Sequence, residues 1–202
     1  MRRRACACVL VGLAVVLGAG QASGDITLAF DPSSQTVGLG ESVDVAITIA
    51  GLVDFDAPSL GGFGFDVLFD DSILSLDDVV FGDPVLGDQL DLFGLGHDEF
   101  RDDTSPGTAY IFELSYDSEQ ELNDLQADSF TLATLTFDTV GLGTSGLLIS
   151  LDLPGALSDS LGSALNATAG TAQVAVVSAP SAMLLGALGV GIVGWMKRRP
   201  LA

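Results

Sequence analysis

The residues of this chain that could bind a metal ion or move a proton are almost all carboxylates. The sequence has 27 aspartates and glutamates but a single histidine, His97. Calcium prefers carboxylate and carbonyl oxygens, so a glycine-rich segment crowded with aspartates is the candidate calcium site. The spacing of these aspartates is not that of an EF-hand loop, and calcium is the one cofactor that the sequence suggests. The candidate ligands between residues 82 and 107 are Asp83, Asp88, Asp91, Asp98, Asp102 and Asp103.

Other residue types that support catalysis are scarce. Cys6 and Cys8 both lie in the first ten residues, and no serine has the Gly-x-Ser-x-Gly pattern of a nucleophile elbow. His97 lies in a polar run, Gly96 to Glu99, where we expect an ordinary solvent-exposed imidazole. We therefore expect a protein that is not an enzyme and has no catalytic residues.

Paired carboxylates leave one enzymatic alternative open. Glycosidases use two carboxylates about 5 to 9.5 Å apart. The sequence has three adjacent aspartate doublets in apparent turns, Asp70-Asp71, Asp77-Asp78 and Asp102-Asp103. A secreted glycan-active enzyme is therefore the alternative, and a pocket holding two such carboxylates would distinguish it.

The acidic residues are confined to one part of the chain. All 27 lie between Asp25 and Asp159, where Arg101 is the single basic residue. Such a charge repels nucleic acid and anionic membrane surfaces and favours a cationic partner. It excludes nucleic acid from the expected partners.

The first 24 residues have the organisation of a secretory signal peptide. Arg2 to Arg4 form a positive region, Ala5 to Leu17 are apolar, and two small-residue cleavage patterns follow, Gly20-Gln21-Ala22 and Ala22-Ser23-Gly24, so that the mature chain would begin at Ser23 or Asp25. The apolar run is short for a membrane span. We expect residues 1–24 to be removed, and since both cysteines lie within them, the mature domain would have no disulfide.

The middle of the chain shows the period-two alternation of half-buried β-strands and no long amphipathic helix. A short helix is expected at Ser118 to Gln126, and a long loop at Gly82 to Gly107. Short strands separated by turn signals favour an all-β sandwich over a parallel α/β sheet. The clearest strands are Ile26 to Phe30, Ser42 to Ala50, Gly62 to Phe69, Ile73 to Leu76, Thr108 to Tyr116 and Phe130 to Val140.

Three segments resemble the cohesin-like domain, a jelly-roll β-sandwich related to carbohydrate-binding modules. Gly40 to Ile47 is similar to its glycine turn and valine strand, and Gly62 to Leu74 to its aromatic strand, aspartate turn and hydrophobic pair. Leu132 to Phe137, with the turn and strand through Ile149, is similar to its late paired strands. The resemblance implies a cohesin-like jelly-roll over residues 25–177.

The C-terminal segment, residues 178–202, resembles the PEP-CTERM sorting signal. Pro180 stands at the second proline of that motif, after Ser178 and Ala179, and an apolar run from Ala182 to Met196 follows. The segment ends in the basic cluster Lys197, Arg198 and Arg199, which would halt export and stay on the cytoplasmic side. The resemblance implies processing by an exosortase-type enzyme, and a retained transmembrane anchor is the alternative.

Together these features predict an exported, non-enzymatic protein of the cell surface or extracellular matrix. The C-terminal helix would anchor it to the membrane at least transiently. Its acidic β-sandwich would bind polysaccharide or another surface protein.

Overall fold

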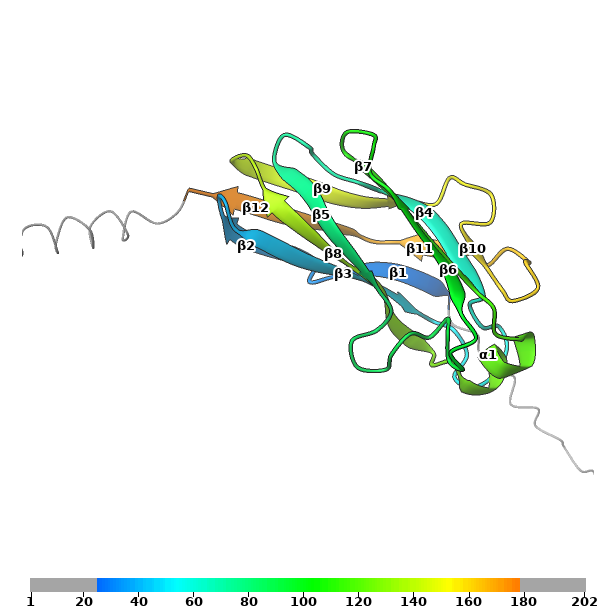
Figure 1. Ribbon diagram of the computed structural model, residues 1–202. Helices are drawn as coiled ribbons and strands as arrows, with labels where there is room; N and C mark the ends of the chain where they lie inside the picture. Colours follow the sequence, from blue (N-terminus) through cyan, green and yellow to red (C-terminus); the bar gives the residue numbers. More distant parts are fainter. Residues whose placement is uncertain (1–24, 179–202) are drawn as a thin grey trace, which may run out of the picture.

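The computed structural model describes residues 25–178, which form twelve β-strands and one short helix. The strands lie in two layers, and the two described ends of the chain lie at opposite ends of the sandwich (Figure 1). The elements are β1 (Ile26–Asp31), β2 (Ser34–Gly38), β3 (Ser42–Ala50), β4 (Gly62–Leu68), β5 (Leu74–Phe81), β6 (His97–Asp102), β7 (Thr108–Ser115), α1 (Glu119–Leu125), β8 (Ser129–Thr139), β9 (Gly143–Ser150), β10 (Leu157–Ser158), β11 (Ala167–Ala169) and β12 (Thr171–Val177).

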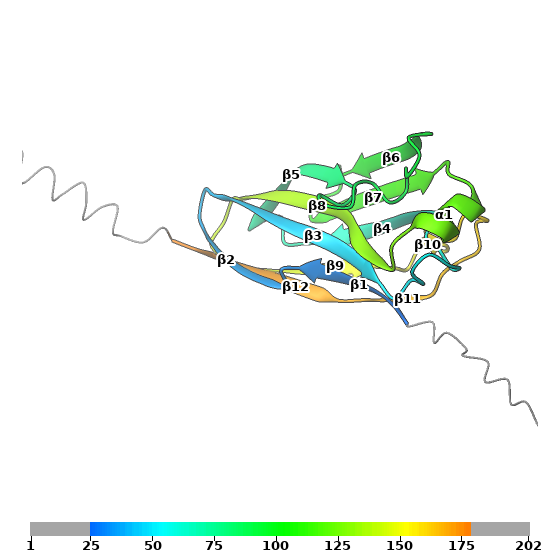
Figure 2. The ribbon, with the colours of Figure 1, turned by 90° about the horizontal axis from the view of Figure 1, so that it is seen from below.

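Two sheets pack face to face in this sandwich (Figure 2). The five-stranded sheet has the order β11-β1-β3-β8-β5. The seven-stranded sheet has the order β2-β12-β9-β4-β7-β6, with β10 paired to β4. Most pairs are antiparallel, whereas β11 runs parallel to β1 and β2 parallel to β12. The edge strands β5 and β6 belong to different sheets, and an ion pair joins them.

The core lies between the sheets and follows from the alternation in the sequence. In β3, Val43, Val45, Ile47 and Ile49 are all buried, while the residues between them face outward. Aromatic residues fill the other layer, where the rings of Phe63 and Phe65 stack with centroids 5.4 Å apart. The predicted all-β sandwich, its valine strand and its aromatic strand are confirmed.

Helix α1 begins and ends within the segment expected to be helical. Ser118 is its N-cap, and Ser118 and Glu121 form a capping box, each accepting a hydrogen bond from the other's backbone N–H. Leu122 is the buried residue of the helix. With the nearby loops, α1 covers one end of the sandwich (Figure 1).

Two predictions about local structure are wrong. The expected loop Gly82 to Gly107 contains strand β6, which forms a full ladder with β7. Five of its six residues are exposed, so its sequence lacks the apolar alternation by which strands are recognised. The doublet Asp77-Asp78, expected in a turn, lies in β5 next to an irregularity in the pairing with β8.

The predicted signal peptide, residues 1–24, and the tail from Ala179 onward lie outside the described residues. Within residues 25–178, no helix combines the length and apolar character that crossing a bilayer requires. The cleavage, sorting and anchoring expectations therefore stay predictions.

Candidate functional site

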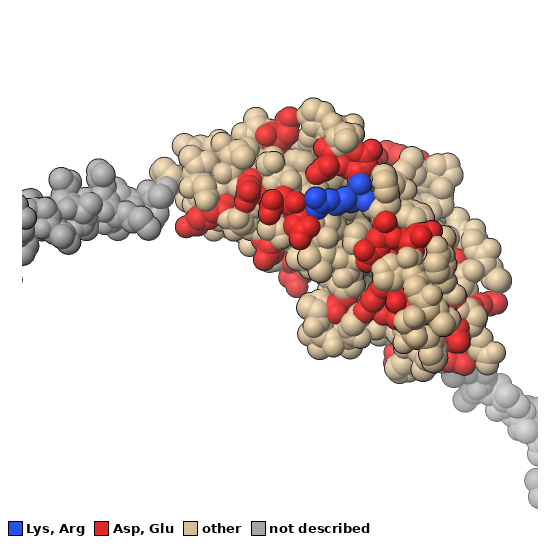
Figure 3. All heavy atoms as spheres, in the orientation of Figure 1, with Lys and Arg blue, Asp and Glu red and all other residues tan. Residues whose placement is uncertain are grey.

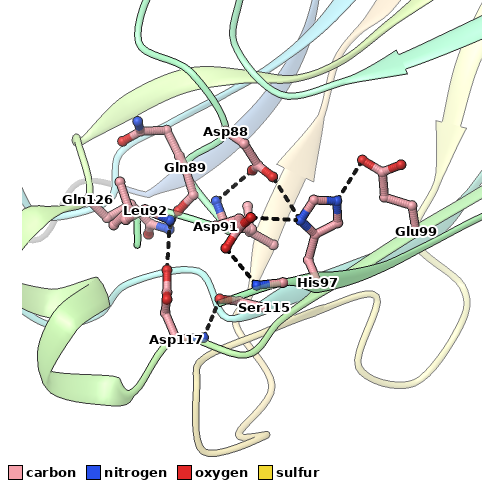
Figure 4. A network of polar contacts seen from close by, with 11 residues as sticks. Asp88, Gln89, Asp91, Leu92, His97, Glu99, Ser115, Asp117 and Gln126 are labelled. Carbon is pink, nitrogen blue, oxygen red and sulfur yellow. Dashed lines mark hydrogen bonds and ion pairs between the residues drawn. The ribbon is translucent and has the colours of Figure 1, made fainter. Parts of the chain in front are cut away.

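Five polar residues lie close together near one end of the sandwich, and Figure 4 labels four of them, Asp88, Asp91, His97 and Glu99. We call Asp88, Asp91, His97, Glu99 and Glu113 the polar cluster. Asp88 and Asp91 come from the segment before β6, His97 and Glu99 from β6, and Glu113 from β7. His97 and Glu99 are two residues apart on one strand and so share a face, and Glu113 pairs directly with Glu99 across the ladder.

His97 is at the centre of this cluster. Its Nδ1 lies 3.2 Å from Asp88 Oδ2 and 3.6 Å from Asp91 Oδ2, and its Nε2 lies 3.0 Å from Glu99 Oε1. The side chain is 24% exposed, so the expectation of an ordinary solvent-exposed imidazole is wrong. An imidazole between carboxylates on both sides is the arrangement expected of a proton carrier or a metal ligand.

Asp88 and Asp91 are held in place by the backbone around them. Asp88 Oδ1 accepts a hydrogen bond from Leu90 N at 2.8 Å, and Asp91 Oδ1 accepts one from Gly96 N at 2.9 Å. Each aspartate thus uses one oxygen to fold its own loop and turns the other toward His97 (Figure 4). Turn-forming hydrogen bonds of this kind are typical of aspartate.

Glu113 is the most unusual member. It is 0% exposed, and neither carboxylate oxygen has a hydrogen-bond partner. Burial raises the pKa of Glu113 to about 9, helped by the nearby charges of Asp88, Glu99 and Asp91. A buried, unpaired carboxyl is costly, so this position needs a proton or a cation to neutralise it.

A second buried carboxyl lies beside the cluster. Asp117 is 6% exposed, and its Oδ2 accepts a hydrogen bond from Leu92 N at 2.7 Å while Oδ1 is unpaired. Burial raises the pKa of Asp117 above its usual value, although the backbone hydrogen bond from Leu92 opposes the shift and the charge of Asp91 adds to it.

The loop that carries Asp88 and Asp91 is attached to the sandwich by two buried glutamines. Gln126 Oε1 accepts from Leu60 N at 2.6 Å, and its Nε2 donates to the carbonyl oxygens of Leu60 and Gln89, both at 2.9 Å. Gln89 Oε1 in turn accepts from Ala127 N at 3.1 Å. These contacts fix the loop relative to the segments before β4 and before β8, and with it the positions of both aspartates.

The structure brings together two of the six predicted calcium ligands, Asp88 and Asp91. Asp83 instead folds its own turn, accepting from Val85 and Leu86, and ties that turn to β8 by accepting from Thr131 N at 2.8 Å. The other three, Asp98, Asp102 and Asp103, are exposed and lie outside the cluster. Calcium binding stays a prediction.

Sequence reasoning missed His97, Glu99 and Glu113 as a group. One signal was present in the strand Thr108 to Tyr116, where alternation puts Glu113 on the same face as Ala109 and Ile111. A charged residue at an inward position of a strand is rare unless it is paired. The cross-strand pairing with Glu99 needed the ladder, which is not visible in one sequence.

A second feature is the outer face of the five-stranded sheet. Its outward residues are mostly small or polar, with Val80 as an exposed aliphatic exception: Thr27, Ala29, Asp31, Ser42, Asp44, Ala46, Thr48, Thr131, Thr134, Thr136, Asp138, Ser75, Asp78 and Val80. Several bond to one another across strands. Ser42 Oγ donates to Asp138 Oδ1 at 2.7 Å, and Thr136 Oγ1 donates to Asp44 Oδ1 at 2.8 Å.

This face is acidic and has one cation at its edge. Arg101 on β6 reaches across to β5, where its Nη1 lies 3.2 Å from Asp78 Oδ1 and 3.4 Å from the Asp77 carbonyl oxygen. It is the one basic residue among residues 25–178, and Figure 3 shows acidic side chains on both sides of it. The ion pair joins the edges of the two sheets and leaves the other carboxylates of the face without a countercharge.

No family model and no curated protein matches this sequence. Solved structures of cohesins match the fold over most of the described residues. The seventh type I cohesin of a scaffoldin from Pseudobacteroides cellulosolvens is 17% identical, with a TM-score of 0.56, over 76% of this chain and 93% of that one. The sixth cohesin of scaffoldin B from Acetivibrio cellulolyticus, solved with a dockerin, is 16% identical, with a TM-score of 0.56, over 76% and 99%.

A further match comes from an archaeon. A non-cellulosomal cohesin from the archaeon Archaeoglobus fulgidus is 14% identical, with a TM-score of 0.53, over 80% of this chain and 97% of that one. At such identities the likeness concerns the fold. Residues 25–178 form a cohesin-like jelly-roll β-sandwich.

Proposed function

We propose that this chain is an exported, non-enzymatic binding module that recognises a basic protein partner through the outer face of its five-stranded sheet. The observation that carries the proposal is this face itself, an open sheet of small hydroxyl and carboxylate side chains whose charge is almost uncompensated. Among the fold's relatives, the sixth cohesin of scaffoldin B was solved bound to a dockerin, so this sandwich can serve protein recognition.

The chemistry of the face favours a protein over a polysaccharide. No aromatic side chain points outward from the described strands β1, β3, β8 and β5, although small ligands are usually held against aromatic and apolar walls. Threonine, serine and alanine lose little conformational freedom on docking. Asp44 and Asp138 each keep one oxygen free of the intramolecular bonds above, so each can accept from an arginine or lysine.

The buried carboxyls support a role other than catalysis. A glycosidase acid needs a raised pKa and access to its substrate. The two carboxyls of raised pKa, Glu113 and Asp117, are 0% and 6% exposed, so a glycan cannot reach them in this conformation.

The test is a comparison of partner capture by matched charge variants. Thr134 lies at the centre of the face, between Ala46 and Val80, and Thr134→Arg would place a bulky cation there. Gln173→Arg makes the same charge change on the exposed side of β12, in the other sheet. Both are used to capture proteins from surface extracts of the source, with identification by mass spectrometry.

We expect Thr134→Arg to retain less than about a tenth of a basic protein that the wild type and Gln173→Arg both capture, and we expect salt to release that protein. Equal capture by all three proteins, or retention of an acidic glycan alone, would contradict the proposal. Export is tested separately by intact mass of the surface protein, expected to begin between Ser23 and Asp25. Loss of Lys197 to Arg199 would indicate sorting, and their retention an anchor.

A further inference from the structure

We propose that His97, Glu99 and Glu113 bind one divalent transition-metal ion, with Asp88 and Asp91 orienting the imidazole. The first observation is proximity. One ligand atom each from His97, Glu99 and Glu113 lie within 4.8 Å of one another, as do ligand atoms from Asp88, Asp91 and His97. Metal ions of this class sit about 2.0–2.2 Å from nitrogen and oxygen ligands, so a small side-chain adjustment would complete the shell.

The second observation is independent of the clustering of acids. Glu113 is fully buried, and both of its oxygens lack any donor. It lies directly opposite Glu99 in the ladder, where two ionised carboxylates would repel each other. A cation between them would turn this repulsion into coordination and would give the Glu113 oxygens the partner they lack.

The charges around His97 also favour a bound cation. Four carboxylates surround one imidazole, and the nearest basic side chain on the same face of β6, that of Arg101, reaches away to Asp78.

The types of ligand atom, one imidazole nitrogen and carboxylate oxygens, indicate which class of metal ion would bind. Calcium and magnesium prefer shells made of oxygen alone, whereas an imidazole combined with carboxylates suits zinc, manganese or iron. The contacts of His97 match a common metal-site pattern, in which one ring nitrogen binds the ion and the other faces a carboxylate. Here Nε2 lies next to Glu99, and Nδ1 faces Asp88 and Asp91.

The experiment is a titration of the full-length chain, in mild non-ionic detergent, after removal of bound metals with EDTA. Zn²⁺ and Ca²⁺ are added in parallel, followed by calorimetry and thermal unfolding. We expect one Zn²⁺ per chain, bound at least about 100-fold more tightly than Ca²⁺. At a hundredfold excess over Kd, Zn²⁺ should raise Tm by about 5–10 °C.

Three variants locate the site. Glu113→Gln keeps the shape of the side chain, and Glu99→Gln alters a side chain that is 41% exposed, so that at least one folds without metal. Both should weaken Zn²⁺ binding more than about 100-fold. Asp98→Asn removes the same charge from the adjacent, outward position of β6 and should bind Zn²⁺ as the wild type does.

The imidazole nitrogen signals in NMR give a readout that a merely structural role would not change. Zn²⁺ should shift the Nε2 resonance of His97 strongly, and Ca²⁺ should not. Equal Zn²⁺ affinity in the wild type and both glutamine variants, a preference for Ca²⁺, or a shift at Nδ1 in place of Nε2 would overturn the assignment.

Discussion

The buried amide of Gln126 provides the sharpest stability test of how the site is assembled. Its side chain satisfies three backbone groups, the N–H and carbonyl of Leu60 and the carbonyl of Gln89, in a position that is 2% exposed. Gln126→Leu keeps the approximate volume but removes all three bonds. The segments before β4 and before β6 would then share no polar link through this side chain.

The expected loss of stability follows from the three backbone groups that would lose their hydrogen-bond partner. A buried backbone group without a partner costs about 1–3 kcal/mol, so three such groups give at least about 3 kcal/mol, or roughly 6–12 °C in Tm for a domain of this size. Urea and thermal unfolding measure this. Hydrogen exchange at the Leu60 amide should speed up in the variant, because that N–H loses its acceptor.

A matched control separates the effect of losing buried hydrogen bonds from the effect of a glutamine-to-leucine substitution as such. Gln173→Leu makes the same change on the exposed side of β12 and should alter stability by less than about 0.5 kcal/mol. If Gln126→Leu costs no more than this control, or if Leu60 exchanges at the wild-type rate, the Gln126 bonds do not hold the loop and the reasoning fails.

Three further predictions concern single residues. Burial opposes ionisation of Asp83, but hydrogen bonds from backbone N–H groups outweigh burial and hold the pKa of Asp83 below its usual 3.8. Asp83→Asn should therefore lower the free energy of unfolding by about 1–2 kcal/mol at pH 6. The stability difference between the wild type and Asp83→Asn should shrink as pH falls below 3.8, because the wild-type carboxyl then takes up its proton. A difference that stays constant with pH would mean that the charge of Asp83 is not what stabilises the turn. Gly61→Ala should cost about 1–3 kcal/mol because its Cβ would lie 2.5 Å from the Ser160 backbone, whereas Gly146→Ala, with open space, should be nearly neutral by urea unfolding. Ser118→Ala removes the N-cap of α1 and should lower stability by about 1 kcal/mol, and no loss would mean that the capping box is unimportant.

Much of the framework was predictable because local patterns express it. Val43 to Ile49 alternate strictly with polar residues, so β3 could be identified with its buried face. The aromatic strand from Gly62 was predicted for the same reason. A short helix was expected at Ser118 to Gln126, and the structure forms α1 there with Ser118 as its N-cap.

Other features depended on pairings between distant segments. Strand β6 is polar apart from Phe100, without apolar alternation, and became a strand because β7 offers it a complete ladder. The parallel pairs of β1 with β11 and of β2 with β12 join the start of the domain to its end, and nothing local encodes them.

The sequence by itself determined the acidic charge, the alternation that forms the core and the cohesin-like resemblance, since each of these depends on residue type and local spacing. Tertiary structure alone decided which carboxylates meet. Glu113 faces Glu99 through the β6–β7 register, and the two aspartates reach His97 through a loop that Gln126 holds from 37 residues away in the chain. Proximity of this kind is a property of the folded chain, because it arises from long-range hydrogen bonds that no short segment contains.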